Sequence, residues 1–147
     1  MHMALLEQLL SGFEGDRLKV YDDATGKPIV KGSVVIGNPT IGHGRCLSTD
    51  GITQDEDNLL FLNDCNKVKN QVAKALPWVL QLSESRQDVF YCMCFQMGLG
   101  GLLSFHNFLA YSQAGQWQQA HDELINSVWH KETGTRCDTL AGMLLTG

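Results

Sequence analysis

The sequence lacks any apolar run of the roughly 20 residues that a transmembrane helix needs. It also lacks an excess of basic residues, because 11 lysines and arginines stand against 16 aspartates and glutamates, giving a net charge of -5. Proteins that bind nucleic acids by neutralising phosphates carry basic clusters, which this sequence does not show. We therefore expect no membrane insertion and no nucleic acid partner.

The sequence pattern predicts neither a secretory leader nor a disulfide framework. The start, MHMALLEQLLSGFEG, has no basic region, and Glu7 and Gln8 interrupt its leucines, which is not typical of a signal peptide. The five cysteines are an odd number with scattered spacing, so we expect reduced and mostly buried thiols. These features predict a protein that is made and folded in a cytoplasm.

The cysteines and histidines also offer little to a metal ion. His43 and Cys46 lie three residues apart, and Cys92 and Cys94 follow downstream. Cys92 and Cys94 fall in a helical pattern, where side chains two residues apart diverge around the axis and do not easily share one ion. We expect no metal site and no cofactor.

What the chain does contain is typical of a soluble globular domain. Its 147 residues are 44% hydrophobic and 18% charged, which is enough for one buried core. There is no internal repeat, low-complexity tract or interdomain linker. We expect a single domain over residues 1–147, with a small β lobe at about 15–50 and a helical lobe at about 53–147.

Helical patterns occupy the start of the chain and most of it after residue 53. Apolar residues at one-face spacing predict a helix over residues 3–13 that delivers Glu14 at its C-terminal end. The sequence TQDE at 53–56 is a capping-box pattern and predicts a helix over about 54–75, which Pro77 ends. Further helices are expected after Ser83, ending at the GLGG of 98–101, and near 104–113, 117–128 and 136–145.

Residues 18–44 have a different character. Glycines and prolines punctuate short β-branched runs such as PIV, SVVIG and PTIG, which predicts a small sheet with tight turns. The expected fold class is α+β: a mostly helical domain with a small antiparallel β-sheet lobe.

Three acids near the N-terminus, Glu14, Asp22 and Asp23, suggest a functional interpretation. Glu14 leaves a hydrophobic helix and Asp23 lies at the entry of a hairpin, so the two carboxyl groups come from elements that can face each other across a cleft. Glycoside hydrolysis needs one carboxyl kept protonated by apolar surroundings and one kept ionised in a wetter place. Glu14, after Phe13, suits the first role and Asp23 the second. Taken alone, the spacing fits solvated surface charge or a cation site as well.

Six ordered sequence blocks resemble those of the phage-type lysozymes, the muramidases of glycoside hydrolase family 24. The resemblance runs from about Leu5 to Gly147 and implies a lysozyme-like fold. The blocks are FEGDRLKVYDDATGKP, PTIGHGRCL, GIT before an acidic capping turn, FQMG, SVWHKETGTR and the terminal LLTG.

The resemblance implies an enzyme that hydrolyses the β-1,4 bond between N-acetylmuramic acid and N-acetylglucosamine with inversion. Glu14 would protonate the leaving oxygen, and Asp23 with Thr40 would place the attacking water. Arg136 would approach and hold Glu14, although a surface arginine is nearly as plausible an interpretation. Phe95 would stack on a sugar ring, with a place in the core as its alternative.

Neighbouring residues receive supporting interpretations. The resemblance implies that Gln96 and Trp129 form a supporting contact beneath the cleft, which is a structural role. His43 lies in the glycine loop beside the site and is expected to be a hydrogen-bonding loop residue rather than a catalyst. Asp22 could be the base in place of Asp23, because adjacent strand side chains face opposite sides and only one can meet a cleft. Thr40 follows Asp23 by a longer interval than in short family members, so PIVKGSVVIGN reads as an enlarged hairpin.

The resemblance also implies partners and a place of action. The expected partner is bacterial peptidoglycan, which a protein made in the host cytoplasm would reach in the periplasm after release, aided by a holin, or as a virion component. A monomer is expected. A binding protein that has lost turnover and a structural virion domain are the alternatives, and the acidic net charge suits delivery by another particle.

Overall fold

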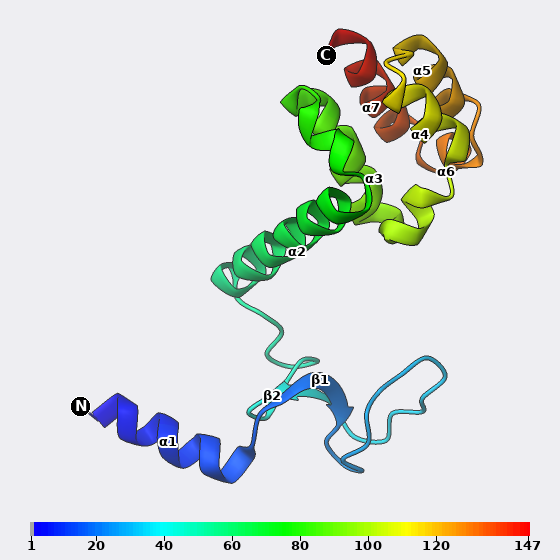
Figure 1. Cartoon of the computed structure of the whole chain (residues 1–147). Coiled ribbons are helices and arrows are strands. Elements are labelled where there is room, and N and C mark those ends of the chain that lie inside the picture. The colour runs from blue at the N-terminus through cyan, green and yellow to red at the C-terminus, as the bar shows by residue number, and fades with distance from the viewer. Residues whose placement is uncertain (1) are drawn as a thin grey trace. The chain divides into compact units, whose positions relative to one another are not determined.

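The computed structural model describes residues 2–147, and their side chains from Leu5 onward (Figure 1). The chain divides into two compact units, one ending at Asp57 and the other spanning Asn58–Gly147. Strands occur in the first unit, and the second is helical. The α+β fold class predicted from the sequence is confirmed.

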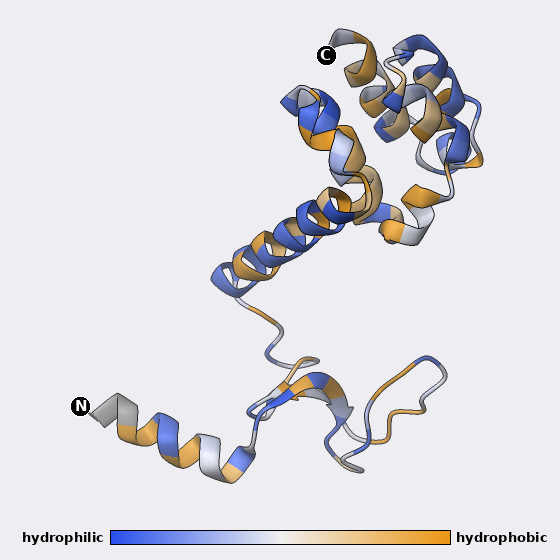
Figure 2. Cartoon of the chain, viewed as in Figure 1, coloured by the Kyte–Doolittle hydropathy of each residue, from blue (hydrophilic) through white to orange (hydrophobic). Residues whose placement is uncertain are grey.

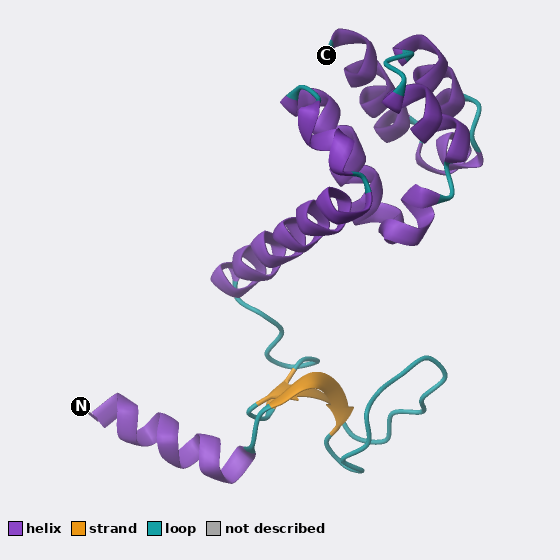
Figure 3. Cartoon of the chain, in the orientation of Figure 1, coloured by secondary structure: helices purple, strands orange, loops and turns teal. Residues whose placement is uncertain are grey.

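The N-terminal unit contains one helix and a small sheet (Figure 3). Helix α1 spans His2–Glu14 and ends at the predicted acid. Strands β1 (Arg17–Asp22), β2 (Pro39–Gly42) and β3 (Arg45–Cys46) form, among the described residues, an antiparallel sheet in the order β1-β2-β3. The register of β1 and β2 sets Tyr21 opposite Thr40 and Asp22 opposite Pro39, which brings Asp23 and Thr40 to the same end of the sheet.

The segment between β1 and β2 is mostly a loop rather than the hairpin strands predicted from PIV and SVVIG. Pro28 makes a single bridge to Tyr21, and the N–H of Ile29 donates to the Val20 carbonyl at 3.0 Å. The run from Ser33 to Gly37 forms no strand. The strand prediction for SVVIG was therefore wrong: the N–H groups of Ile36 and Gly37 donate to the Asp22 side chain, and that of Ser33 donates to the Val30 carbonyl within a turn.

Helix α2 spans Gln54–Ala75, as predicted. The capping box is formed: the Thr53 N–H donates to Glu56 Oε2 at 2.8 Å, and the Glu56 N–H donates to Thr53 Oγ1 at 3.3 Å. A 3₁₀ helix, Pro77–Gln81, follows at the predicted proline. Local chemistry is therefore sufficient to set both ends of this helix.

Helix α3, Glu84–Leu103, starts at the predicted cap, where Ser83 accepts the N–H of Arg86 at 3.4 Å. Its predicted end at the GLGG sequence was only partly right. Gly98 leaves the helical conformation, with φ 75° and ψ 167°, which is a region that favours glycine. The helix then resumes to Leu103, because Leu102 is fully buried and anchors this last part to the core.

The remaining helices are α4 (His106–Gln113), α5 (Trp117–Ile125), α6 (Val128–Thr133) and α7 (Thr135–Thr146). They complete an apolar core with α2 and α3, whose fully buried members include Val72, Phe90, Leu102, Phe108, Leu124 and Leu144. Hydrophobic segments accordingly alternate with hydrophilic ones along these helices (Figure 2). Helix α6 was not predicted as a separate element.

No single helix within residues 2–147 is both long and apolar enough to cross a membrane. Among the described residues, α3 and α4 taken together have the length and apolar composition of a membrane span, but these two helices are bent by 101° at their junction.

Candidate active site

Asp23 and Thr40 are connected through Asn38. The Asp23 N–H donates to the Asn38 carbonyl at 3.1 Å, and Thr40 Oγ1 donates to the same carbonyl at 3.1 Å. The Asp23 carboxylate accepts the Asn38 N–H at 2.6 Å through Oδ1 and the Asn38 side-chain amide at 3.2 Å through Oδ2. A carboxylate and a hydroxyl from two different strand ends are thus held by one residue.

The two adjacent acids of this turn have opposite environments. Asp23 is exposed, whereas Asp22 is only 4% exposed. The Asp22 carboxylate accepts three backbone N–H groups, from Ala24 at 2.9 Å, Ile36 at 2.7 Å and Gly37 at 3.0 Å. The bond from Ile36 contributes most to holding the pKa of Asp22 below its ordinary value, against the opposing effect of burial. Of the two acids, only Asp23 faces solvent.

Thr40 is a buried residue of β2, with 3% of its surface exposed. Because its hydroxyl donates to the Asn38 carbonyl, its oxygen lone pairs stay available as acceptors. Thr40 therefore ties the strand to the turn in addition to any role toward a water molecule.

Glu14 lies at the end of α1 beside the turn between β2 and β3. A Cβ atom placed on Gly44 would lie 3.4 Å from Glu14 Oε2, so the backbone of that turn is close to the carboxyl. One turn earlier in the helix, Ser11 Oγ and His43 Nε2 are hydrogen-bonded at 3.2 Å. The expectation that His43 is a hydrogen-bonding loop residue is confirmed.

The apolar surroundings expected for Glu14 are not provided by its own unit. Glu14 is exposed, and the neighbouring Phe13 is 80% exposed. Within the part of the N-terminal unit that the structure describes, Glu14 therefore sits at a solvated surface.

Phe95 and Arg136 belong to the C-terminal unit, where both line a pocket of about 410 Å³. Phe95 is 50% exposed and meets the ring of Phe61 edge-on, with centroids 6.0 Å apart, so it is not part of the core. Gln96 and Cys92 line the same pocket; burial raises the pKa of the Cys92 thiol, and the charge of Arg136 opposes that rise.

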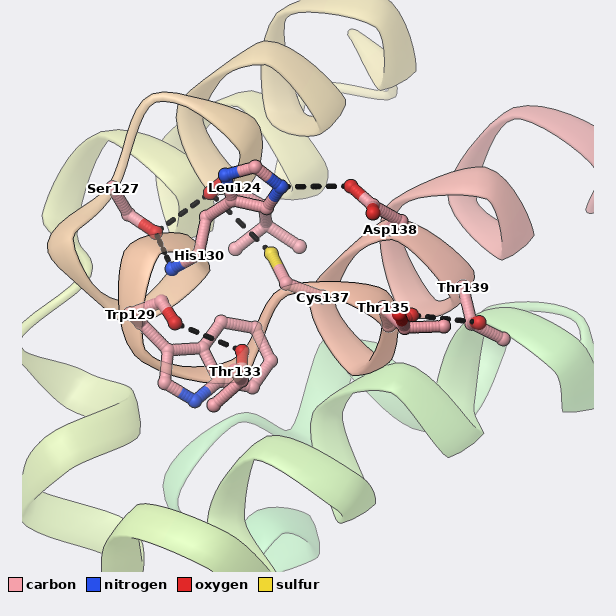
Figure 4. A network of polar contacts seen from close by, with 9 residues as sticks. All are labelled: Leu124, Ser127, Trp129, His130, Thr133, Thr135, Cys137, Asp138 and Thr139. Carbon is pink, nitrogen blue, oxygen red and sulfur yellow. Dashed lines mark hydrogen bonds and ion pairs between the residues drawn. The ribbon is translucent and has the colours of Figure 1, made fainter.

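Trp129 lies in the core of the C-terminal unit, beside the polar network that joins α6 and α7 (Figure 4). In that network, His130 Nε2 and Asp138 Oδ1 are 2.7 Å apart, and the Thr133 hydroxyl donates to the Trp129 carbonyl at 2.8 Å. Trp129 Nε1 is buried and has no hydrogen-bond partner among the described residues. The contact expected between Gln96 and Trp129 is therefore not made through this nitrogen.

Sequence reasoning missed Asn38 and Gly37 as members of the site. A Cβ atom on Gly37 would collide with Asp23 Oδ1 and with Ala24, so the turn closes only because position 37 is glycine. The available signal was the sequence GNP at 37–39, which marks a turn directly before the strand of Thr40. Its relation to Asp23 depends on contacts that are distant in the sequence. Within residues 2–147, no cluster of three or more His, Cys, Asp or Glu side chains could hold a metal ion.

Comparison with known proteins assigns the chain to a family. It is 28% identical to the pre-baseplate central spike protein Gp5 of Enterobacteria phage T4 over 97% of its own length, but it spans only 28% of that protein. It is 23% and 26% identical to the probable T4-type lysozymes 1 and 2 of Dictyostelium discoideum, over 97% of the chain and 94% of each relative. Residues 11–144 match the phage lysozyme family, and the chain therefore belongs to the phage lysozyme family.

Proposed function

We propose that this protein is a peptidoglycan hydrolase: a muramidase of glycoside hydrolase family 24 that cleaves the β-1,4 bond between N-acetylmuramic acid and N-acetylglucosamine. The observation that carries the proposal is the hydrogen-bonded connection of Asp23 to Thr40 through Asn38. It gathers a solvent-facing carboxylate and a hydroxyl at one end of the sheet in a chain of the phage lysozyme family.

Glu14 acts as the general acid. When the glycosidic bond breaks, the leaving oxygen takes the Glu14 proton, and this requires the carboxyl to be protonated before reaction. Glu14 is exposed within its own unit, so its carboxyl is open to an incoming glycosidic oxygen.

Asp23 acts as the general base. Its two contacts with Asn38 use both carboxylate oxygens as acceptors, as an ionised carboxylate does. Asp23 takes a proton from a water molecule as the water oxygen bonds to the anomeric carbon on the face opposite the leaving group, which inverts that centre. The Thr40 oxygen accepts a hydrogen bond from the same water.

Phe95 and Arg136 contribute from the pocket of the C-terminal unit. The half-exposed ring of Phe95 is suited to stacking on a sugar face, and Arg136 is a supporting residue at the same pocket. The reaction uses neither a metal nor an organic cofactor.

The chemistry is tested by digesting purified sacculi and identifying the new chain ends. A muramidase yields reducing-end N-acetylmuramic acid, whereas a lytic transglycosylase yields an anhydro sugar and an amidase leaves the glycan intact. Proton NMR of the first product distinguishes inversion from retention at the anomeric carbon. Digestion without new reducing ends would overturn the proposal.

The matched variants are Glu14→Gln and Glu7→Gln, which lie on the same helix and are both exposed. Glu14→Gln removes the transferable proton and should lower kcat by at least about 10²-fold, because general acid catalysis contributes 10²–10⁴-fold. Glu7→Gln should leave kcat unchanged. Equal activity of the two variants would exclude Glu14 as the acid.

The similarity to a phage spike protein favours a second candidate, a structural virion domain that keeps the lysozyme fold. A structural domain would not digest sacculi, and Glu14→Gln would leave its assembly unchanged. Under the muramidase proposal, the same similarity favours delivery to the periplasmic wall by a virion, with release by a holin as the other route.

A further inference from the structure

Asp22 is a buried acid that the hydrolytic reaction does not use. It is the last residue of β1, and its carboxylate accepts the backbone N–H groups of Ala24, Ile36 and Gly37. A buried carboxylate is tolerated when such donors satisfy it, and removing its acceptors would leave buried N–H groups unpaired. The arrangement makes Asp22 the central acceptor of the turn.

The three donors come from the two ends of one loop. Ala24 directly follows Asp23, whereas Ile36 and Gly37 directly precede Asn38. By binding both ends, Asp22 brings Asp23 and Asn38 together across the 14 to 15 residues that separate Asp22 from its distant donors. Closing a loop of this length costs conformational entropy, which these bonds offset.

The closed turn leaves no spare room between Asp23 and Gly37. The Asp23 carboxylate packs against the Gly37 backbone so closely that a Cβ atom on Gly37 would overlap Asp23 Oδ1 and Ala24. Gly37 is itself held by Asp22 Oδ1 at 3.0 Å. The direction of the Asp23 side chain therefore depends on where Asp22 holds Gly37.

We propose that Asp22 is a positioning residue, which closes the loop from Ala24 to Gly37 and so fixes Asn38, the Asp23 carboxylate and the Thr40 hydroxyl for attack by water. This role rests on the proposed hydrolysis. Asp22 is 4% exposed and both its carboxylate oxygens accept N–H groups of the loop, so its role is to hold other residues in place.

The first test replaces the carboxylate with an amide of the same shape. In Asp22→Asn, one side-chain oxygen remains as an acceptor for three N–H groups, and the amide nitrogen faces at least one of them. We expect kcat to fall by roughly 10²-fold, the size of effect that an ångström-scale misplacement produces, with KM changed by no more than about threefold. Asp50→Asn, an exposed acid of the same unit, is the control.

A second variant keeps Asp22 and removes one donor. Ile36 is 75% exposed, and its N–H makes the shortest of the three bonds, so Ile36→Pro deletes that donor with little loss of packing. Ile36→Pro should lower kcat, as Asp22→Asn does. Val34→Pro, at an 87% exposed position of the same loop, is the matched control. This pair keeps the inference testable if Asp22→Asn does not fold.

A readout that is independent of activity comes from the amide NMR signals of Asn38. In Asp22→Asn, the backbone and side-chain amide signals of Asn38 should move, because both groups donate to Asp23. Signals of α4 and α5 should stay in place. A merely structural loss of stability would lower the unfolding midpoint but leave these Asn38 signals unchanged in the folded protein.

The outcomes separate the two proposals. Active wild type with a low kcat and moved Asn38 signals in Asp22→Asn would support positioning. Two results with an active wild type would overturn only the positioning role. One is a kcat that is unchanged in both Asp22→Asn and Ile36→Pro, and the other is a set of Asn38 signals that is unchanged in Asp22→Asn. Wild-type protein that does not digest sacculi would overturn the proposed function, and the positioning role with it.

Discussion

Asp23 and Asn38 are joined by three hydrogen bonds. The Asp23 N–H donates to the Asn38 carbonyl, and the Asp23 carboxylate accepts both the backbone N–H and the side-chain amide of Asn38. Two of the three use the Asp23 carboxylate, so rotation of this side chain must break bonds to Asn38. A solvent-exposed acid is therefore held in one direction by its partner, which is the orientation that the proposed general base would need.

We expect Asn38→Ala to lower kcat while the turn stays closed. The variant loses the 3.2 Å side-chain bond to Asp23 but keeps both backbone bonds. One hydrogen bond contributes about 0.5–1.5 kcal/mol, which corresponds to a loss of up to about tenfold. Steady-state kinetics on sacculi measure the effect, with the exposed Asn63→Ala as control. Unchanged kcat would show that the backbone bonds alone orient Asp23.

Trp129 should contribute to stability through its size and not through its N–H group. It is 6% exposed and meets the Phe105 ring edge-on at 6.3 Å, and its Nε1 has no partner within the described part of the chain. Trp129→Ala should cost about 3–5 kcal/mol of unfolding free energy, as large-to-small core substitutions do. Trp129→Phe should cost clearly less.

Urea denaturation with a constant m-value measures these differences. Val128→Ala, at a neighbouring position that is 67% exposed, should change the free energy of unfolding by less than about 0.5 kcal/mol. If Trp129→Phe were as destabilising as Trp129→Ala, a hydrogen bond of Nε1 would have to be considered.

Acid should destabilise the N-terminal unit through two carboxylates. The Ile36 N–H holds the pKa of Asp22 below its ordinary value, and the Thr53 N–H, with Arg45, does the same for Glu56. A folded-state pKa below the unfolded one gives stability that is present above the unfolded pKa and lost as pH falls through the folded pKa. Stability should thus decline below roughly pH 4, the ordinary range of carboxylates.

The decline can be followed by the backbone amide signals of Ile36 and Gly37 during an acid titration. Asp22→Asn should reduce stability at pH 7 and lose less of it on acidification than the wild type does. The exposed Asp50→Asn should follow the wild-type curve. Parallel curves for Asp22→Asn and wild type would argue against this carboxylate as a source of the acid sensitivity.

Cys46 should be the most reactive thiol toward alkylation. The hydroxyl of Ser48, 3.2 Å from the Cys46 sulfur, contributes most to lowering the pKa of this thiol. Burial raises the pKa of Cys94, and burial with Asp138 raises that of Cys137 to about 11. Because the thiolate is the nucleophile, iodoacetamide at pH 8 should label Cys46 first.

Peptide mass spectrometry after short labelling times identifies the modified site. Ser48→Ala should slow the labelling of Cys46 and leave the buried thiols as they were. Faster labelling at Cys65 or Cys92 would contradict the expected order.

Elements that depend on nearby residues could be predicted from the sequence. Thr53 and Glu56 lie three residues apart, and their reciprocal bonds start α2 where the pattern placed it. Ser83 caps α3 for the same reason. The separate α6 was recoverable too, because Ser127 accepts the His130 N–H at 3.1 Å and so begins a new helix.

Elements that depend on distant residues could not be predicted in this way. The β-branched run SVVIG favours a strand, but Asp22 takes the N–H groups of Ile36 and Gly37 from far along the chain. The pairing of Asp23 with Asn38 has the same origin. The sequence singled out Asp23 and Thr40 through a family resemblance, whereas Asn38 emerged only from the folded turn.

Because hydrogen bonds to Asp22 hold the loop near both of its ends, its middle can vary. Residues 31–35 lie beyond the bonds to Asp22 and include Val34, which is 87% exposed. Substitutions or short insertions there can accumulate without moving Asp23 or Thr40. This apex is accordingly the place where related proteins can diverge most freely, and where a foreign peptide could be grafted.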